Sequence, residues 1–294
     1  MSDSATQETI NVDSLIQYLQ QQKSKGETHV HLDEQAKLIL REFYIRAMGG
    51  QSTSANQAVK PASDPQSKPV DYTEKQVVPV ESPTVTVKGN TSTEKIQSLK
   101  AQAQSSAVIK GLTTLRKTLV FSAGNPDADI MLIGEAPGYH EEKQQTPFAG
   151  PAGKKLDGIL KAMGLSREEV YLTYLVKFRP LMENQTTNNR KPTDKEIEVF
   201  NPYIEQEIQT VKPKIIVTLG TLASITLLNF DGSIDQLRGK QHQIAGLPTR
   251  VTFHPSYLLS NDSNTEKRKL WEDMLDVMND LGLPISEKQQ NFFK

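Results

Sequence analysis

The chain has 294 residues, of which 36% are hydrophobic, and its formal net charge at pH 7 is −1. This balance excludes a global cationic field, so binding to nucleic acid would need a local basic patch. The chain contains no cysteine, which excludes disulfides, thiolate nucleophiles and every zinc or iron–sulfur site with cysteine ligands.

The N-terminal residues carry neither the basic start nor the apolar core of a signal peptide. No segment approaches the roughly 20 consecutive apolar residues of a transmembrane helix. We therefore expect a cytoplasmic protein that has no membrane association and holds no metal or other cofactor.

Residues 1–50 are predicted to form a short helical module, because apolar residues recur at helical spacing on both sides of a turn at Gly26. Two short helices bury little core alone, so residues 11–48 are a candidate docking site for a protein partner. Residues 51–106 are rich in Ser, Thr, Gln, Lys and Pro, with Tyr72 the only aromatic residue. This composition predicts a disordered linker.

Residues 107–283 are predicted to form one α/β domain, followed by a tail over 284–294. Strand-like apolar runs alternate with segments of helical periodicity. The predicted strands are residues 130–133, 170–176, 215–219 and 250–253, and the predicted helices are residues 152–163, 193–210, 221–228 and 266–281. This alternation predicts a three-layer α/β/α fold with a central, mostly parallel sheet.

Polar motifs directly follow two of the predicted strands. The first motif is Gly-Glu-Ala-Pro-Gly at residues 134–138, continued by Thr-Pro-Phe-Ala-Gly at residues 146–150. The second motif is His-Pro-Ser-Tyr-Leu-Leu at residues 254–259. In open α/β sheets ligands bind beyond the carboxyl ends of the strands, so both motifs are candidates for one site.

Together the two motifs resemble the signature segments of the uracil-DNA glycosylase superfamily. They are most similar to the bacterial and archaeal branch (family 4) that normally carries an iron–sulfur cluster, and the resemblance covers roughly residues 107–281. It implies a hydrolase of base excision repair, which flips a deaminated base, most readily uracil, out of damaged DNA and cleaves its N-glycosidic bond.

The resemblance also implies catalytic roles. It places Glu141 near the attacking water and Glu135 beside the base pocket, although Glu141 and Glu142 could instead begin a solvated stretch. His254 is the natural electrophile, because an imidazole donor aimed at a developing base anion stabilises the transition state.

Base binding is assigned to the first motif and the strand that follows it. Phe148 matches the aromatic residue on which the flipped base stacks, and Gly134 and Ala136 belong to the pocket wall. Tyr174 stands where the family has an asparagine that hydrogen-bonds the Watson–Crick edge of uracil. A phenol offers one rotatable hydroxyl in place of an amide donor and acceptor. Specificity could therefore be shifted, activity could be weak, or the chain could be a DNA-binding relative without glycosylase activity.

DNA contacts are predicted at the second motif and at a local basic patch. Ser256 is suited to binding phosphate, and either Leu258 or Leu259 would enter the base stack when a nucleotide is flipped out. The alternative for each leucine is a place in the core. Lys177 and Arg179 are assigned to the basic patch, with scattered solvated charges as the alternative.

The cluster cysteines of the family would fall at four positions of this chain. These positions are Ala107, Lys110, Phe178 and Phe200. None of them is a cysteine, and two are phenylalanine. We expect hydrophobic packing of Phe178 and Phe200 to replace the structural role of the cluster.

Overall fold

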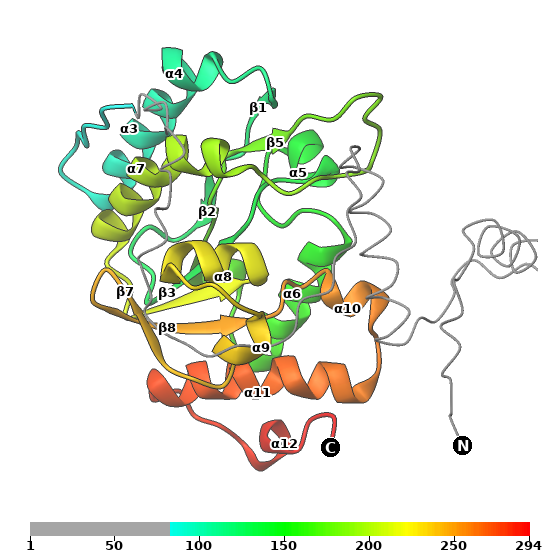
Figure 1. The fold of residues 1–294 in the computed structure, drawn as a ribbon. Helices are drawn as coiled ribbons and strands as arrows, with labels where there is room; N and C mark the ends of the chain where they lie inside the picture. Colours follow the sequence, from blue (N-terminus) through cyan, green and yellow to red (C-terminus); the bar gives the residue numbers. More distant parts are fainter. Residues whose placement is uncertain (1–82) are drawn as a thin grey trace, which may run out of the picture. The chain divides into compact units, whose positions relative to one another are not determined.

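The computed structural model describes residues 83–294, so the helices predicted within residues 11–48 and the first part of the predicted linker lie outside the described residues. A six-stranded sheet with the order β2-β4-β3-β6-β8-β7 forms its centre (Figure 1). Its strands are β2 (Ser122–Gly124), β3 (Ile130–Gly134), β4 (Val170–Tyr174), β6 (Ile215–Leu219), β7 (His242–Ile244) and β8 (Leu247–Thr252).

The four inner strands of this sheet run parallel. β3 pairs in parallel with β4 and with β6, and β6 pairs in parallel with β8, while the edge strands β2 and β7 are antiparallel to their neighbours. Two further strands, β1 (Leu115–Leu119) and β5 (Phe178–Pro180), form a separate antiparallel pair. The predicted mostly parallel sheet is confirmed.

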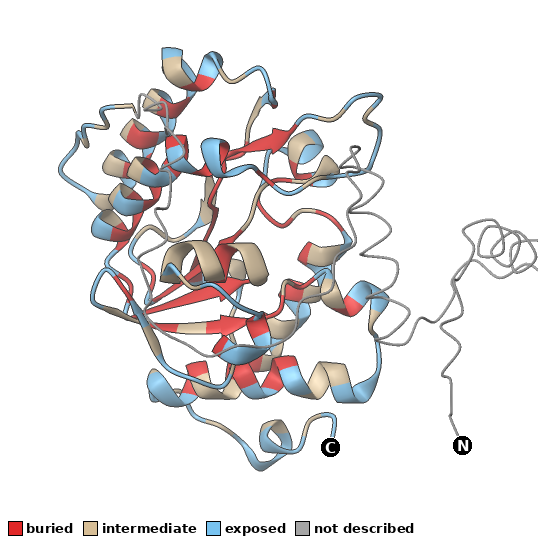
Figure 2. Ribbon diagram, viewed as in Figure 1, coloured by how far each residue is buried: buried red, intermediate tan, exposed pale blue. Residues whose placement is uncertain are grey.

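Helices cover both faces of the six-stranded sheet. They are α3 (Ser92–Ser105), α4 (Ala107–Lys110), α5 (Tyr139–Gln144), α6 (Pro151–Met163), α7 (Asp194–Val211), α8 (Thr221–Leu228), α9 (Ile234–Leu237), α10 (Tyr257–Ser260), α11 (Asn264–Asp280) and α12 (Glu287–Gln290), with a 3-10 turn η1 (Arg167–Glu169). Helices α3 and α7 contribute to the core on one face, and α6 and α11 to the core on the other. The buried strands lie between these layers (Figure 2), as predicted for an α/β/α fold.

Residues of a single strand contribute alternately to the two cores. Met131 and Ile133 of β3 pack on the α7 side, whereas Ile130 and Leu132 pack on the α6 side. Successive side chains of a strand point to opposite faces, so a strand that is apolar at every position is required when helices cover both faces.

The linker prediction is wrong for residues 92–105, which form helix α3. Thr91 and Glu94 make a reciprocal capping box at its N-terminus. Ile96, Leu99 and Ala103 are buried in the core that α7 also lines. These apolar residues are few but share one helix face, a pattern that the overall polar composition of the segment concealed.

The segment predicted as a C-terminal tail packs onto the domain. The indole N–H of Trp271 donates to the carbonyl of Gln289 at 2.7 Å, and the Gln289 amide donates to the carbonyl of Ala162 at 2.8 Å. The rings of Trp271 and Phe292 lie 5.3 Å apart. Residues 284–294 therefore cover the α6–α11 layer.

Phe178 and Phe200 belong to one buried core, as predicted from the loss of the cluster cysteines. Their ring centroids lie 6.0 Å apart, and both side chains pack in the same hydrophobic cluster as Ile109 of α4. Ala107 and Lys110 of α4 are exposed. Iron–sulfur clusters are held by thiolates, so a cluster does not fit the residues at these four positions.

Replacing Phe200 by alanine is expected to lower the free energy of unfolding by about 3–5 kcal/mol, since it empties a fully buried aromatic site. Chemical denaturation measures this change. Phe293→Ala is the matched control, because Phe293 is 42% exposed and should change stability by no more than about 0.5 kcal/mol. Equal effects of the two substitutions would contradict a structural role for Phe200.

None of the helices within residues 83–294 is both long and apolar enough to cross a membrane.

Candidate active site

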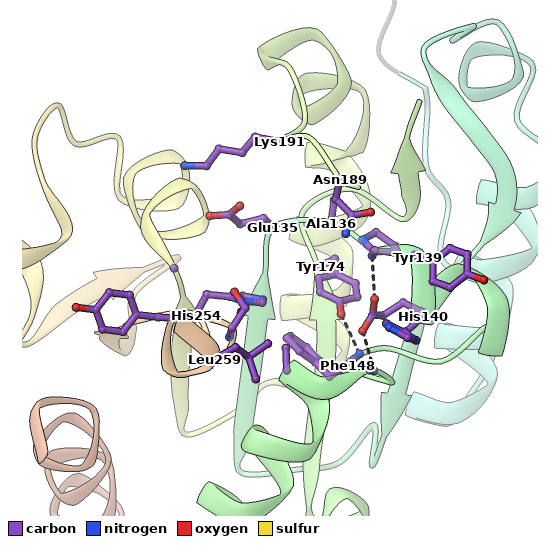
Figure 3. A pocket seen from close by; sticks show the side chains of 18 of the residues that line it. Glu135, Ala136, Tyr139, His140, Phe148, Tyr174, Asn189, Lys191, His254 and Leu259 are labelled. Atoms are coloured by element: carbon purple, nitrogen blue, oxygen red, sulfur yellow. Dashed lines mark hydrogen bonds between the residues drawn. The ribbon is translucent and has the colours of Figure 1, made fainter. Parts of the chain in front are cut away.

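A cavity of about 600 Å³ opens at the carboxyl ends of the parallel strands (Figure 3). Residues of both sequence motifs line it, together with Tyr174 at the end of β4 and part of the loop that follows β5. The predicted residues Glu135, Ala136, Phe148 and His254 are among them. The fold therefore brings the two motifs to one site.

Phe148 and Tyr174 form the aromatic wall of this pocket. Their ring centroids lie 4.7 Å apart with an angle of 34° between the planes, and the Phe148 N–H donates to the Tyr174 hydroxyl at 2.8 Å. A Cβ atom on Gly134 would lie 2.8 Å from Tyr174 Cδ1 and 2.9 Å from Phe148 Cζ. Only glycine at residue 134 leaves room for both rings.

The turn that carries Phe148 is held from outside the pocket by Arg167. Phe148 has a φ of +52°, a left-handed conformation that is uncommon for a bulky side chain. The Arg167 guanidinium donates to the carbonyls of Pro147 at 2.9 Å and Phe148 at 2.5 Å. Sequence reasoning missed Arg167, because a polar residue ahead of a strand carries no signal of a contact with a distant turn.

Glu141 braces the two halves of the first motif. Its carboxylate accepts hydrogen bonds from the N–H groups of Gly138 at 3.0 Å, Ala149 at 3.0 Å and Gly150 at 3.2 Å. Glu141 is buried, so the alternative of a solvated stretch is wrong for this residue. These three amides are therefore bound within the protein.

Glu135 faces the pocket from the turn after β3. Its Oε1 accepts from the N–H of Leu222 at 3.1 Å, in the first turn of α8. Burial raises the pKa of Glu135, and the nearby Lys191 ammonium opposes that shift. With one hydrogen bond to the backbone, Glu135 keeps more free acceptor positions than Glu141.

The contacts of His254 with Ser256 select one tautomer of the neutral imidazole ring. Its Nδ1 lies 3.2 Å from the backbone N–H of Ser256 and 2.7 Å from the Ser256 hydroxyl. A backbone N–H can only donate, so Nδ1 accepts and Nε2 carries the proton of the neutral ring. Burial lowers the pKa of His254 to about 4, while the negative charge of Glu141 acts in the opposite direction.

The two leucines of the second motif have different environments. Leu258 is 5% exposed and packs in the core with α6 and α11, whereas Leu259 is 46% exposed and lines the pocket. The assignment of Leu258 to DNA binding is therefore corrected to a place in the core. Leu259 stays a candidate for entering the base stack, because its side chain is free at the pocket mouth.

Lys177 is not part of a DNA-binding surface. Its side chain is fully buried, forms an ion pair with Glu207 of α7 and donates to the hydroxyl of Thr173. Burial lowers the pKa of Lys177, an effect that Glu207 opposes. The prediction is wrong because the partner carboxylate comes from a distant helix, which the motif around Lys177 does not reveal.

Arg179 is also turned away from solvent. It is 2% exposed, and its guanidinium donates to Glu142 and Asn189, each at 2.9 Å. Two further donor contacts, each at 2.8 Å, reach the carbonyls of Thr186 and Asn188. The predicted DNA contact of Arg179 is therefore wrong. Its guanidinium instead holds the loop that follows β5.

Similarity to known proteins extends over the whole pocket. Residues 121–275 match the Uracil DNA glycosylase superfamily, and this range contains every residue that lines the cavity. The Type-4 uracil-DNA glycosylase of Sulfurisphaera tokodaii is 34% identical over 62% of this chain and 83% of its own length. The Type-4 uracil-DNA glycosylase of Thermotoga maritima is 39% identical over 54% of this chain and 81% of its own length.

The fold and the site thus define a DNA glycosylase, a hydrolase of N-glycosyl bonds. The chain belongs to the uracil DNA glycosylase superfamily.

Proposed function

We propose that this protein excises a deaminated base, with uracil as the first candidate, from DNA in base excision repair, and that it does so without an iron–sulfur cluster. The observation that carries the proposal is the placement of His254: its Nδ1 accepts from the Ser256 N–H, which leaves the proton of the neutral ring on Nε2, and the ring lies beside Phe148 with 6.0 Å between the ring centroids. The similarity to Type-4 uracil-DNA glycosylases supports uracil as the base.

His254 acts on the departing base in this proposal. Cleavage of the bond between the sugar C1′ and the base nitrogen leaves the bonding electrons on the base, where a uracil anion carries charge on its O2. A neutral Nε2–H donor directed at that oxygen stabilises the charge as it develops. Phe148 provides the aromatic surface on which the flipped base stacks.

The carboxylates act on the other side of the broken bond. The sugar acquires positive charge as the nucleobase leaves. Water then adds to C1′, and the proton that it loses passes to a carboxylate. We assign stabilisation of the sugar to Glu135, which has free acceptor positions. Glu141 holds the surrounding amides and retains about one acceptor position for the water.

The test is base release from labelled oligonucleotides that contain uracil, hypoxanthine or xanthine, in single and double strands. We expect release from uracil-containing DNA by protein free of iron. Absence of release from every substrate would refute the proposed activity.

A second candidate is a DNA-binding relative whose excision is weak or absent, and the position of Tyr174 favours it. The Tyr174 ring lies against Phe148, and its hydroxyl accepts the Phe148 N–H. A base stacked on that face of Phe148 would have to displace Tyr174. The two candidates differ in the expected behaviour of the Tyr174→Asn variant.

We also propose that residues 11–48 bind a protein partner of the repair machinery. Removing residues 1–82 keeps α3 and the whole described domain, so excision from naked DNA should be unchanged. The measurement is capture of the partner protein, compared between the full chain and the shortened chain. Loss of folding, or retention of the partner by the shortened chain, would refute this role.

A further inference from the structure

The turn that carries His254 starts from the end of β8, a strand that contacts both α9 and α11 (Figure 1). Thr252 is the last residue of β8, and Phe253 connects it to His254. The Phe253 side chain is buried in the same core as residues of α11. The contacts that fix Thr252 and Phe253 therefore also fix the point from which His254 enters the pocket.

Arg238, directly after α9, joins this turn to α11. Its Nε and Nη2 atoms donate to the carboxylate of Asp273 at 2.8 and 3.2 Å, and Nη2 also donates to the carbonyl of Lys269 at 2.7 Å. The same carboxylate accepts from the hydroxyl of Thr252 at 2.7 Å. One buried carboxylate of α11 thus holds both the guanidinium group and the end of β8.

The guanidinium group of Arg238 lies over one face of Phe253. Its Cζ is 4.0 Å from the centroid of the Phe253 ring, a distance at which a cation is attracted to an aromatic face. Tyr257 stacks on Phe253 with 4.4 Å between the centroids and 16° between the planes, and its hydroxyl donates to Glu266 of α11 at 2.7 Å. Both groups cannot share one face at these distances, so Phe253 lies between Arg238 and Tyr257.

Phe253 and Tyr257 are the two ends of the turn that holds His254. The Tyr257 N–H donates to the carbonyl of His254 at 2.8 Å, which closes the turn. The contacts between His254 and Ser256 lie inside the turn, so they select the tautomer but do not fix the turn relative to the sheet. This matters for the rate, because a catalytic group misplaced by about 1 Å can lower it about 10²-fold.

We propose that Arg238 is a positioning residue for His254: its guanidinium group, held by Asp273, fixes Phe253 and thereby the direction in which the imidazole faces the departing base. Arg238 is not among the residues that line the pocket, so it acts on the base only through the turn. The proposal rests on the proposed function, because it takes His254 as the group that acts on the base.

A double-mutant cycle of single-turnover excision tests this role. Arg238→Met keeps a long side chain without the guanidinium group, and it should lower the excision rate about tenfold or more while DNA affinity changes little. In the His254→Ala background the same substitution should change the remaining rate by no more than about twofold, because the group that Arg238 positions is already gone. Equal losses in the two backgrounds would overturn the role, since a general structural effect does not depend on the imidazole.

Arg250→Met is the matched control. Arg250 on β8 donates to Asp280 of α11 at 2.6 and 2.9 Å, so it also joins the strand to the helix. Its side chain is 15% exposed, against 12% for Arg238, but it has none of the cation–aromatic contacts found within residues 83–294. Excision should stay near the wild-type rate although an ion pair is lost. A loss as large as that of Arg238→Met would overturn the proposal.

The proton NMR shifts of the His254 ring give a second measurement, which needs no excision. They depend on the place of the imidazole beside the ring of Phe148, and His254→Ala assigns them. They should move in Arg238→Met and stay unchanged in Arg250→Met. Arg238→Lys replaces Arg238→Met in both measurements if the latter does not fold, because it keeps a cation beside Asp273 without the flat guanidinium face.

Unchanged ring shifts in the folded Arg238 variant would overturn the positioning role. Shifts that move in a chain that releases no base would support the positioning role and refute the proposed excision. The two failures are thereby distinguished.

Discussion

Replacing His254 by alanine is expected to lower the rate of base excision about 10²–10³-fold, the loss typical of removing one donor to a developing anion. The neutral ring presents Nε2–H because Nδ1 is occupied by Ser256. Alanine removes this donor and leaves the aromatic wall of the pocket in place. Single-turnover excision from uracil-containing DNA measures the loss, and DNA affinity should change little.

The control for this substitution is His242→Gln. His242 lies on β7, contacts the carbonyl of Leu237 and does not line the pocket, so excision should stay at the wild-type rate. A His254→Ala variant that is as active as His242→Gln would show that the imidazole does not act on the base.

The same donor predicts how the excision rate of the wild type depends on pH. The pKa of His254 is near 4, so the ring is neutral at physiological pH and becomes charged only as the pH falls toward that value. Glu135, whose pKa is raised by burial, also gains a proton as the pH falls. A proton on Nδ1 of His254 would face the backbone N–H of Ser256 and disturb the placement of the ring, and a protonated Glu135 loses the negative charge that stabilises the sugar. The pH profile of the rate should therefore decline on its acid side and be flat near neutrality.

Replacing Tyr174 by asparagine is expected to raise excision of uracil about fivefold or more. The smaller amide clears the face of Phe148 that Tyr174 now covers and supplies a donor and an acceptor for the edge of the base. A recovered pair of hydrogen bonds contributes about 1–3 kcal/mol, which is about five- to 150-fold in kcat/KM. Steady-state excision from single-stranded uracil-containing DNA gives this ratio.

Tyr174→Phe separates the hydroxyl from the ring. It keeps the ring against Phe148 but leaves the buried Phe148 N–H without its acceptor, which costs about 1–3 kcal/mol of stability. The phenyl ring still covers Phe148 and offers no hydrogen bond to the base, so excision should not rise in this variant. If wild type and Tyr174→Asn both release little or no uracil, recognition of the base is not what limits this chain, and the candidate of a weak DNA-binding relative is favoured.

The sequence determined which segments form the sheet and which motifs stand at its carboxyl edge. Unbroken apolar runs specified the buried parallel strands, and the residues directly after β3 and β8 had to meet at one edge of the sheet. The exchange of cysteine for Phe178 and Phe200 likewise predicted a packed core. These features can be predicted from the sequence because they depend on local periodicity and on the order of residues along the chain.

The tertiary structure alone decided what each polar side chain contacts. Lys177 is paired with Glu207 of α7, Arg167 holds the distant Phe148 turn, and only Leu259 of the leucine pair is exposed. A sequence motif states where a residue lies along a strand or loop, but the partner that buries or frees its side chain comes from an element far away in the chain. For the same reason a few apolar residues could make α3 a helix inside a segment of linker-like composition, once α7 supplied the surface on which they pack.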